Sequence, residues 1–326
     1  MRATFAAVLF VGLAGILGVF VFACAPRPLG LPPLGPTPEP PATVQASARS
    51  GRAPAARPRP RRTPRPIPMA APTSVPLAAA RLPNGLLDGI TLEPVADYGL
   101  VVEDLATGAR VAMNETAVFP SASLYKLGVA WLVLREVDAS TLRLDTPLAI
   151  EAEDAVEAEP DGGVAEGDTP SVRNALEAML SLSSNNAAHA FLRVLGRDAL
   201  HAEMNRIGLT QTRVPDDGLP VTTASDIARL LRLIATSPQL STASRAVLLD
   251  SITNIAPPDA LRDTLPESVD ILDKTGNLED ASNVGALLES PRGTAILVVL
   301  DHGVDPGDAR SVIAEAGMAA YHALLQ

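Results

Sequence analysis

The chain has 326 residues, of which 26 are basic and 37 acidic, and its formal net charge at neutral pH is −11. Residues 81–326 alone carry 17 basic and 36 acidic side chains, a net charge of −19. Binding to phosphates needs a basic surface, so we expect no nucleic acid among its partners. The single cysteine, Cys24, excludes a disulfide framework and a cysteine-based metal site within one chain.

The N-terminal segment contains an unbroken run of 21 uncharged, mostly apolar residues from Thr4 to Cys24. This is longer than the ~7–15 residues of a signal-peptide core and close to the ~20 that span a bilayer. Three predictions stay open: a lipoprotein box that ends at Cys24, an Ala-x-Ala cleavage site at 23–25, and an uncleaved anchor. All three place the rest of the chain outside the cytoplasm, and the first and third tether it to the membrane.

Residues 25–80 are dominated by proline, alanine and arginine, with eight arginines and one acid, Glu39. Such a composition buries too little apolar surface to fold and predicts an extended, disordered spacer. An alternative is adhesion of the arginines to anionic lipid or wall polymer. The predicted organisation is therefore a leader or anchor at 1–24, a linker at 25–80 and one folded domain at 81–326.

Within that domain the hydrophobic pattern and the turn residues predict strands near both ends and helices between them. In chain order we expect strands at 100–105 and 109–113, helices at 123–137, 171–192 (interrupted near 183) and 223–235, strands at 269–274, 283–289 and 294–300, and a C-terminal helix at 305–325. This order indicates an α/β (α+β) fold with one antiparallel sheet built from both termini and a helical insertion. Trp131 is expected in the core, and Asp226 at a helix start.

The two lysines of the chain, Lys126 and Lys274, both lie in short motifs, while every other basic residue is arginine. A desolvated lysine can lose its proton and act as a base, which a guanidinium cannot do. Ser123 and Lys126 are three residues apart, so a helix would place them on one face. Lys126 would then accept the proton of the Ser123 hydroxyl. By itself this spacing is common, and an exposed helix lysine near a serine is the alternative.

Two further motifs follow in the chain. Ser183 of Ser183-Ser184-Asn185 could relay a proton to a leaving nitrogen, and Asn185 could bind a substrate amide; alone, the motif also fits a polar helix junction. In Lys274-Thr275-Gly276, the first two side chains can bind a carboxylate, and Gly276 lets a substrate backbone approach closely. Together the three motifs indicate an active-site serine hydrolase.

These motifs resemble those of the serine β-lactamase and penicillin-binding protein superfamily, in particular its class A β-lactamase-like branch, over roughly residues 95–326. The flanking segments 119–123, 171–176 and 186–188 are also similar to that branch. The resemblance implies a β-lactamase/transpeptidase-like fold with an all-helical lobe. It implies Ser123 as nucleophile, Lys126 as its base, Ser183 and Lys274 as the proton relay, and the backbone N–H groups of Ser123 and Asn277 as the oxyanion hole.

The chain departs from the class A pattern where that branch carries a glutamate that activates the deacylating water. The stretch 213–222 offers only Asp216 and Asp217 as replacements, and Glu166 precedes Ser183 and cannot fill the place. Ser184 also stands where the family has aspartate. Acylation is expected to survive both changes, whereas fast hydrolysis needs one of the two aspartates to act as the base.

By resemblance, the leading functional expectation is a β-lactamase that acts through a Ser123 ester. A penicillin-binding D,D-peptidase acting on cell-wall peptides is the alternative, and a non-catalytic wall-binding lipoprotein is the rival outside enzymes. No cofactor and no metal are expected, because the four histidines are scattered and none has a second metal-binding residue at a suitable spacing. We expect a monomer.

Overall fold

The computed structural model describes residues 82, 85–92, 97–155, 163–253 and 260–326. The predicted leader or anchor at 1–24, with Cys24, and the predicted linker at 25–80 lie outside these described residues. Among the described residues, none of the helices combines the length and the apolar character needed to cross a membrane.

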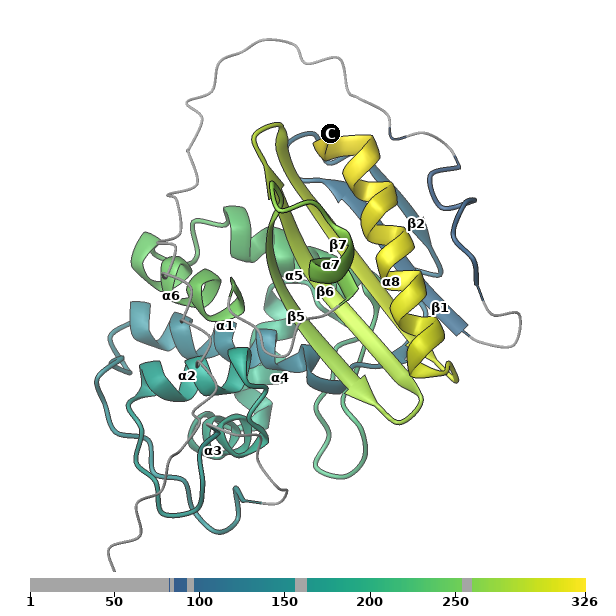
Figure 1. The fold of residues 1–326 in the computed structure, drawn as a ribbon. Coiled ribbons are helices and arrows are strands. Elements are labelled where there is room, and N and C mark those ends of the chain that lie inside the picture. Colours follow the sequence, from purple (N-terminus) through teal and green to yellow (C-terminus); the bar gives the residue numbers. More distant parts are fainter. Residues whose placement is uncertain (1–81, 83–84, 93–96, 156–162, 254–259) are drawn as a thin grey trace, which may run out of the picture. The chain divides into compact units, whose positions relative to one another are not determined.

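One five-stranded antiparallel sheet forms the centre of the described fold (Figure 1). Its strands are β1 (Asp97–Asp104), β2 (Arg110–Met113), β5 (Asp270–Leu278), β6 (Ala281–Ser290) and β7 (Gly293–His302), in the order β2-β1-β7-β6-β5. The predicted sheet built from both termini is thereby confirmed. Strand β5 continues four residues beyond Lys274, so the whole Lys274-Thr275-Gly276 motif lies within an edge strand.

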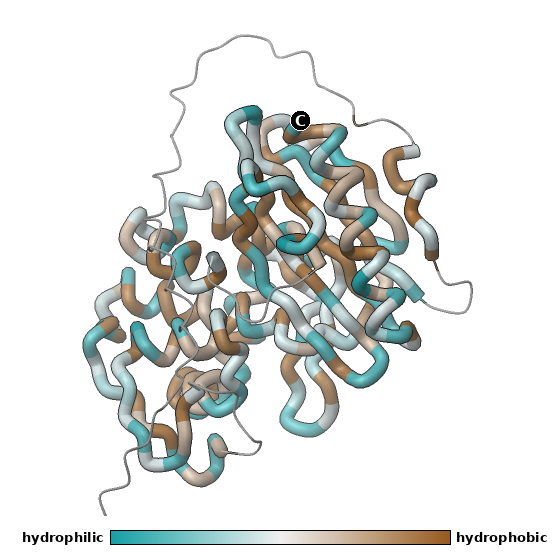
Figure 2. The backbone as a smooth tube through the Cα atoms, in the orientation of Figure 1, coloured by the Kyte–Doolittle hydropathy of each residue, from teal (hydrophilic) through white to brown (hydrophobic). Residues whose placement is uncertain are grey.

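Side chains alternate between the two faces of the sheet, as strand geometry requires. Leu297 and Val299 of β7 pack with α8 (Pro306–Ala320), whereas Ile296 and Val298 pack into the helical core on the other side. Helix α5 (Ala224–Thr236) and the short helix α7 (Ala260–Thr264) also contribute to these two cores, α5 to the helical one and α7 to that of α8. Figure 1 shows α8 lying along the sheet, and Figure 2 shows hydrophobic segments along the strands and the helices that cover them.

The helical lobe is built around α1 (Tyr125–Asp138), which follows a short 3₁₀ turn, η1 (Ala122–Leu124). Every residue from Tyr125 to Leu134 is buried, so this part of the predicted helix is covered on all sides. Trp131 is fully buried, and its indole nitrogen donates to Glu203 Oε1 at 2.8 Å. It is therefore a core residue, as expected.

The remaining helices surround α1. The predicted helical stretch at 171–192 consists of α2 (Val172–Ser181) and α3 (Asn185–Leu195), which break around Ser183 as expected. Ser171 caps α2, Ser184 caps α3 and Thr223 caps α5 through their side-chain oxygens. The sequence patterns did not predict α4 (Arg197–Arg206), α6 (Thr242–Thr253), α7 or the two-stranded sheet of β3 (Phe119–Pro120) and β4 (Val221–Thr222).

Candidate active site

Ser123 lies in the 3₁₀ turn that joins β3 to α1, and its side chain is half-buried. The preceding residue, Ala122, has a left-handed backbone with φ of 44°. This conformation is uncommon for a residue with a side chain, and such residues concentrate at functional sites. The neighbouring Ser121 donates its backbone N–H to the Pro220 carbonyl at 2.8 Å. The chain thus turns sharply at Ala122, and the hydrogen bond from Ser121 to Pro220 fixes the backbone just before this turn.

Strand β5 passes directly beside this turn. A Cβ atom placed on Gly276 would lie 2.9 Å from the backbone nitrogen of Ser123 and 3.0 Å from the Ser121 carbonyl oxygen. Only glycine allows this approach without displacing one of the two backbones. The glycine was predicted to admit a substrate backbone, and the structure shows that it also admits the nucleophile's own backbone.

Lys126 is fully buried, and its ammonium points to the segment that joins α2 to α3. Its Nζ donates to Asn185 Oδ1 at 2.6 Å, to the Ser183 carbonyl at 2.5 Å and to Ser183 Oγ at 3.4 Å. The first and second predicted motifs therefore meet. Asn185 thus lies against Lys126, and its bond to a substrate amide stays a prediction.

Lys274 reaches the same segment from strand β5, and only 1% of its surface is exposed. Its Nζ donates to Ser183 Oγ at 3.2 Å and to the Thr275 carbonyl at 2.7 Å. Burial lowers the pKa of Lys274 to about 8, and the neighbouring carboxylate of Asp273 opposes this shift. Asp273 is fully buried itself, with Asp273 Oδ1 lying 2.6 Å from Nη1 of Arg262 on α7.

Ser183 is the residue at which both lysines converge. Its backbone is also left-handed, with φ of 60°, and its side chain is half-buried. A hydroxyl between two lysine amino groups can accept a proton from one of them while it donates its own onward. This arrangement is compatible with the relay role of Ser183, which stays a prediction.

Thr275 is half-buried and Asn277 exposed, one on either side of the buried Gly276. Since β5 is an edge strand, its outer backbone groups are not used by another strand of the sheet. The backbone N–H groups of Asn277 and Ser123, assigned above to an oxyanion hole by resemblance, thus belong to two segments in close contact at Gly276.

The loop that carries Asp216 and Asp217 is short and held at its base. Arg213 and Val221 form an antiparallel bridge, and the buried Asp226 carboxylate accepts from the backbone of residues 211 and 212, both at 2.9 Å. Asp216 Oδ1 lies 3.5 Å from Nη1 of Arg197, with 89% of its side chain exposed, and Asp217 is exposed too. The role of either aspartate as a deacylation base stays a prediction.

Asn283 of β6 is the site-flanking residue that the sequence did not single out. It is buried, and its Nδ2 donates to the carbonyl of Pro120, three residues before Ser123, at 2.8 Å. No motif or periodicity marks this asparagine, because its contact depends on how β3 lies against the sheet.

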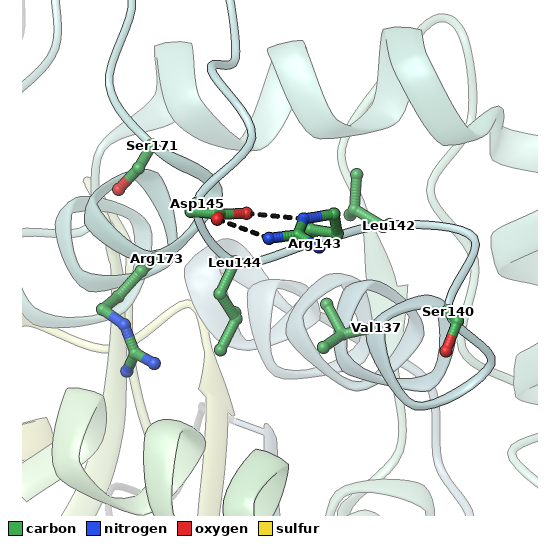
Figure 3. Close-up of a pocket in the computed structure, with 8 residues that line it drawn as sticks. All are labelled: Val137, Ser140, Leu142, Arg143, Leu144, Asp145, Ser171 and Arg173. Carbon is green, nitrogen blue, oxygen red and sulfur yellow. Dashed lines mark hydrogen bonds and ion pairs between the residues drawn. The ribbon is translucent and has the colours of Figure 1, made fainter.

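A separate open depression of about 680 Å³ lies at the far end of α1 (Figure 3). Figure 3 shows the ion pair between Arg143 and Asp145, and the depression is lined by Val137, Ser140, Leu142, Arg143, Leu144, Asp145, Ser171 and Arg173. None of these residues belongs to the three motifs. Both members of the ion pair are strongly exposed, so the depression lacks the buried polar groups of a built site.

No group of three metal-ligating side chains occurs among residues 82, 85–92, 97–155, 163–253 and 260–326. The described histidines have structural or surface contacts: His201 Nε2 accepts from the backbone N–H of Val214, and His302 lies 3.4 Å from Asp280.

Comparison with known proteins agrees with this geometry. Residues 89–324 match the sequence profile of the beta-lactamase enzyme family, Beta-lactamase2. An ancestral class A β-lactamase (GNCA) is 32% identical, with a TM-score of 0.65 over 70% of this chain and 95% of that one. A β-lactamase from Xanthomonas campestris pv. campestris is 28% identical, with a TM-score of 0.63 over 73% and 94% of the two chains.

The protein PBP-A is 21% identical, with a TM-score of 0.68 over 73% of this chain and 93% of that one. At this identity, the likeness to PBP-A concerns the fold.

Proposed function

The chain belongs to the beta-lactamase enzyme family and is a serine hydrolase; we propose that it opens β-lactam amides through a Ser123 acyl-enzyme and hydrolyses the ester. The observation that carries this proposal is the convergence of both buried lysines on Ser183 Oγ, at 3.4 Å from Lys126 and 3.2 Å from Lys274. Such a site can take a proton from the nucleophile and deliver one to the leaving nitrogen without a metal or cofactor.

In the proposed acylation step, Ser123 Oγ attacks the carbonyl carbon while Lys126 accepts the hydroxyl proton. The backbone N–H groups of Ser123 and Asn277 stabilise the oxyanion. When the C–N bond breaks, Ser183 donates its proton to the nitrogen and is reprotonated by a lysine. Lys274 and Thr275 bind the carboxylate of the substrate.

A penicillin-binding D,D-peptidase is the second candidate, and one observation favours it. Asp216 is paired with Arg197 and Asp217 is exposed, so neither carboxylate is buried beside the motifs. Without a base within hydrogen-bond reach of a water, a Ser123 ester would persist or be transferred to an amine. The substrate would then be a peptide of the cell wall rather than the antibiotic.

The intact mass of the full chain, followed over time after addition of a penicillin, tests the proposal. A Ser123-dependent adduct that decays within seconds while product accumulates supports a β-lactamase, and an adduct that lasts for hours supports the peptidase. The Ser123→Ala variant is the control and should form no adduct. If the unaltered chain formed neither an adduct nor product, both enzymes would be contradicted, and a different acyl substrate or the wall-binding lipoprotein would remain.

We also propose that the enzyme works outside the cytoplasm as a monomer, tethered by its N-terminal segment. The supporting features are the 21-residue apolar run, the lone Cys24 at its end and the Arg-rich spacer behind it. Metabolic labelling with a fatty acid, compared between the unaltered chain and Cys24→Ala, separates lipidation from an uncleaved anchor. Protease accessibility of the catalytic domain in intact cells tests the side of the membrane.

A further inference from the structure

Strands β6 and β7 are joined differently at their two ends. From Ser290–Gly293 to Val284–Val299 they form a regular antiparallel ladder. Beyond this point, side-chain oxygens accept the bonds from the backbone. The backbone N–H of Ser282 donates to Asp301 Oδ1 at 2.9 Å, and that of Asp301 donates to Asn283 Oδ1 at 3.0 Å. The strands therefore bow apart beside the site, where two side chains bridge the gap, and they meet again where the backbone N–H of Gly303 donates to the Asp280 carbonyl at 2.9 Å.

Asn283 uses both ends of its amide in this bridge. While Oδ1 accepts from the backbone of Asp301, Nδ2 donates to the carbonyl of Pro120 at 2.8 Å. The side chain is only 1% exposed, so no bulk water competes for these bonds. One neighbour is a donor and the other an acceptor, which fixes the orientation of the amide.

The bond to Pro120 lies immediately upstream of the nucleophile. Between Pro120 and Ser123 the chain makes the left-handed turn at Ala122, a conformation that persists only where its surroundings impose it. Ser121 is held by Pro220, and Gly276 presses against Ser123 from the other side. Asn283 completes this support by tying the start of the turn to the main sheet.

We propose that Asn283 is a positioning residue for the nucleophile, acting through the Pro120 carbonyl to hold the turn that presents Ser123. The reaction it serves is the proposed acyl transfer, and the placement itself is independent of the substrate. Asn283 does not touch the reacting atoms in this role. Its loss should slow the covalent step and leave the initial binding of substrate unchanged.

Two variants isolate the bond to Pro120. Asn283→Ala removes both bonds, whereas Asn283→Asp keeps an oxygen for the Asp301 N–H and places a carboxylate opposite the Pro120 carbonyl. If the Pro120 bond matters, the aspartate variant does not rescue the alanine variant. We expect the acylation rate constant to fall about 10–100-fold in both, because small misplacements of reacting groups are costly.

Ser244→Ala is the matched control for a lost buried hydrogen bond. Ser244 Oγ donates to Asp138 at the last residue of α1, at 2.7 Å. Twelve residues of helix separate Asp138 from Lys126, which is about 18 Å at 1.5 Å per residue. This variant should lose stability without losing acylation rate.

Pre-steady-state acylation by a chromogenic β-lactam, at a temperature where every variant is folded, gives the binding constant and the rate constant separately. Hydrogen exchange of the peptide that spans residues 119–126, without substrate, gives a second reading. We expect faster exchange there in both Asn283 variants and unchanged exchange in Ser244→Ala.

Unaltered exchange at 119–126 in Asn283→Ala, or an acylation rate constant equal to that of the unaltered chain, overturns the positioning role. If the unaltered chain forms no Ser123 adduct, the proposed function fails instead, and the exchange measurement alone decides on Asn283.

Discussion

Ser183 Oγ accepts a hydrogen bond from Lys274 Nζ at 3.2 Å, although 91 residues separate the two in the chain. Ser183 belongs to the junction of two helices in the lobe, and Lys274 to the edge strand of the sheet. The bond therefore crosses between the two layers of the fold. Since Lys126 meets the same hydroxyl at 3.4 Å, the protonation of the site depends on how the lobe lies on the sheet.

Replacing Ser183 by alanine should remove the relay and leave the fold intact. We expect acylation of Ser123 to slow by roughly 10²–10⁴, the usual contribution of a positioned proton donor. The measurement is the rate of adduct formation by mass spectrometry. Ser181→Ala, which removes a buried hydroxyl bonded to the Ser251 carbonyl at 2.7 Å, is the control. Equal rates for the two variants would contradict a relay at Ser183.

Acylation should fall at alkaline pH because Lys274 loses its charge. Burial lowers its pKa to about 8, so the ammonium that attracts a substrate carboxylate is present below pH 8 and is lost as the pH rises through that value. We expect the second-order acylation constant to decrease about tenfold per pH unit above this pKa.

Lys274→Arg provides the comparison for this profile, since a guanidinium stays charged to far higher pH. Its acylation constant should be lower overall, because arginine does not fit the lysine's bonds, but flat between pH 8 and 10. A decrease with the same midpoint in both proteins would assign the titration to another group.

The main sheet and the three motifs were predictable from the sequence because each rests on local signals. The alternation of a strand, a hairpin turn and a short motif each depend on residues that are close together in the chain. Helix α6 was missed because it buries serines such as Ser244 and Ser251 and so lacks an apolar stripe. The left-handed backbone of Ala122 was not predictable either, since alanine carries no signal for it and the surrounding segments impose it.

The Asn283 contact shows a second limit. Its two bonds arise because β6 and β7 bow apart locally beside it, and this local gap follows from packing rather than from any residue pattern. Gly276 shows the same limit. The motif predicted a glycine that lies beside the substrate, whereas the structure shows that the backbone of Ser123 also leaves no room for a side chain at this position.

The Gly276→Ala variant tests whether the close approach of the Ser123 backbone requires glycine at this position. The new Cβ would lie 2.9 Å from the Ser123 backbone nitrogen and 3.0 Å from the Ser121 carbonyl, so one of the two segments must move. We expect a loss of about 1–3 kcal/mol in the free energy of unfolding from overpacking and an acylation rate lower by about 10²-fold. Gly293→Ala is the control, because nothing lies within 4 Å of its Cβ position. Normal acylation by the Gly276 variant would contradict the tight approach.

The stability of the domain should depend on the charge of Asp301. Burial, with a smaller contribution from Asp280, raises the pKa of this fully buried carboxyl to about 6, against the backbone bond from Ser282, which lowers it. The folded state therefore binds the proton more tightly than the unfolded state, whose pKa is near 3.8. The contribution of Asp301 to the free energy of unfolding is therefore fully present below pH 4. It is lost as the pH rises from 4 to 6, by at most about 3 kcal/mol.

The Asp301→Asn variant isolates the contribution of the Asp301 charge to the free energy of unfolding. The asparagine keeps an oxygen for the Ser282 N–H and carries no charge, so the difference in unfolding free energy between the variant and the unaltered chain should shift in favour of the variant from pH 4 to pH 7. Burial also raises the pKa of Glu289, but this contribution is present in both proteins and cancels in the difference. Urea denaturation at several pH values measures it. Any constant offset reports the fit of the amide, so a difference that does not change with pH would show that the pKa of Asp301 is the same in the folded and unfolded states.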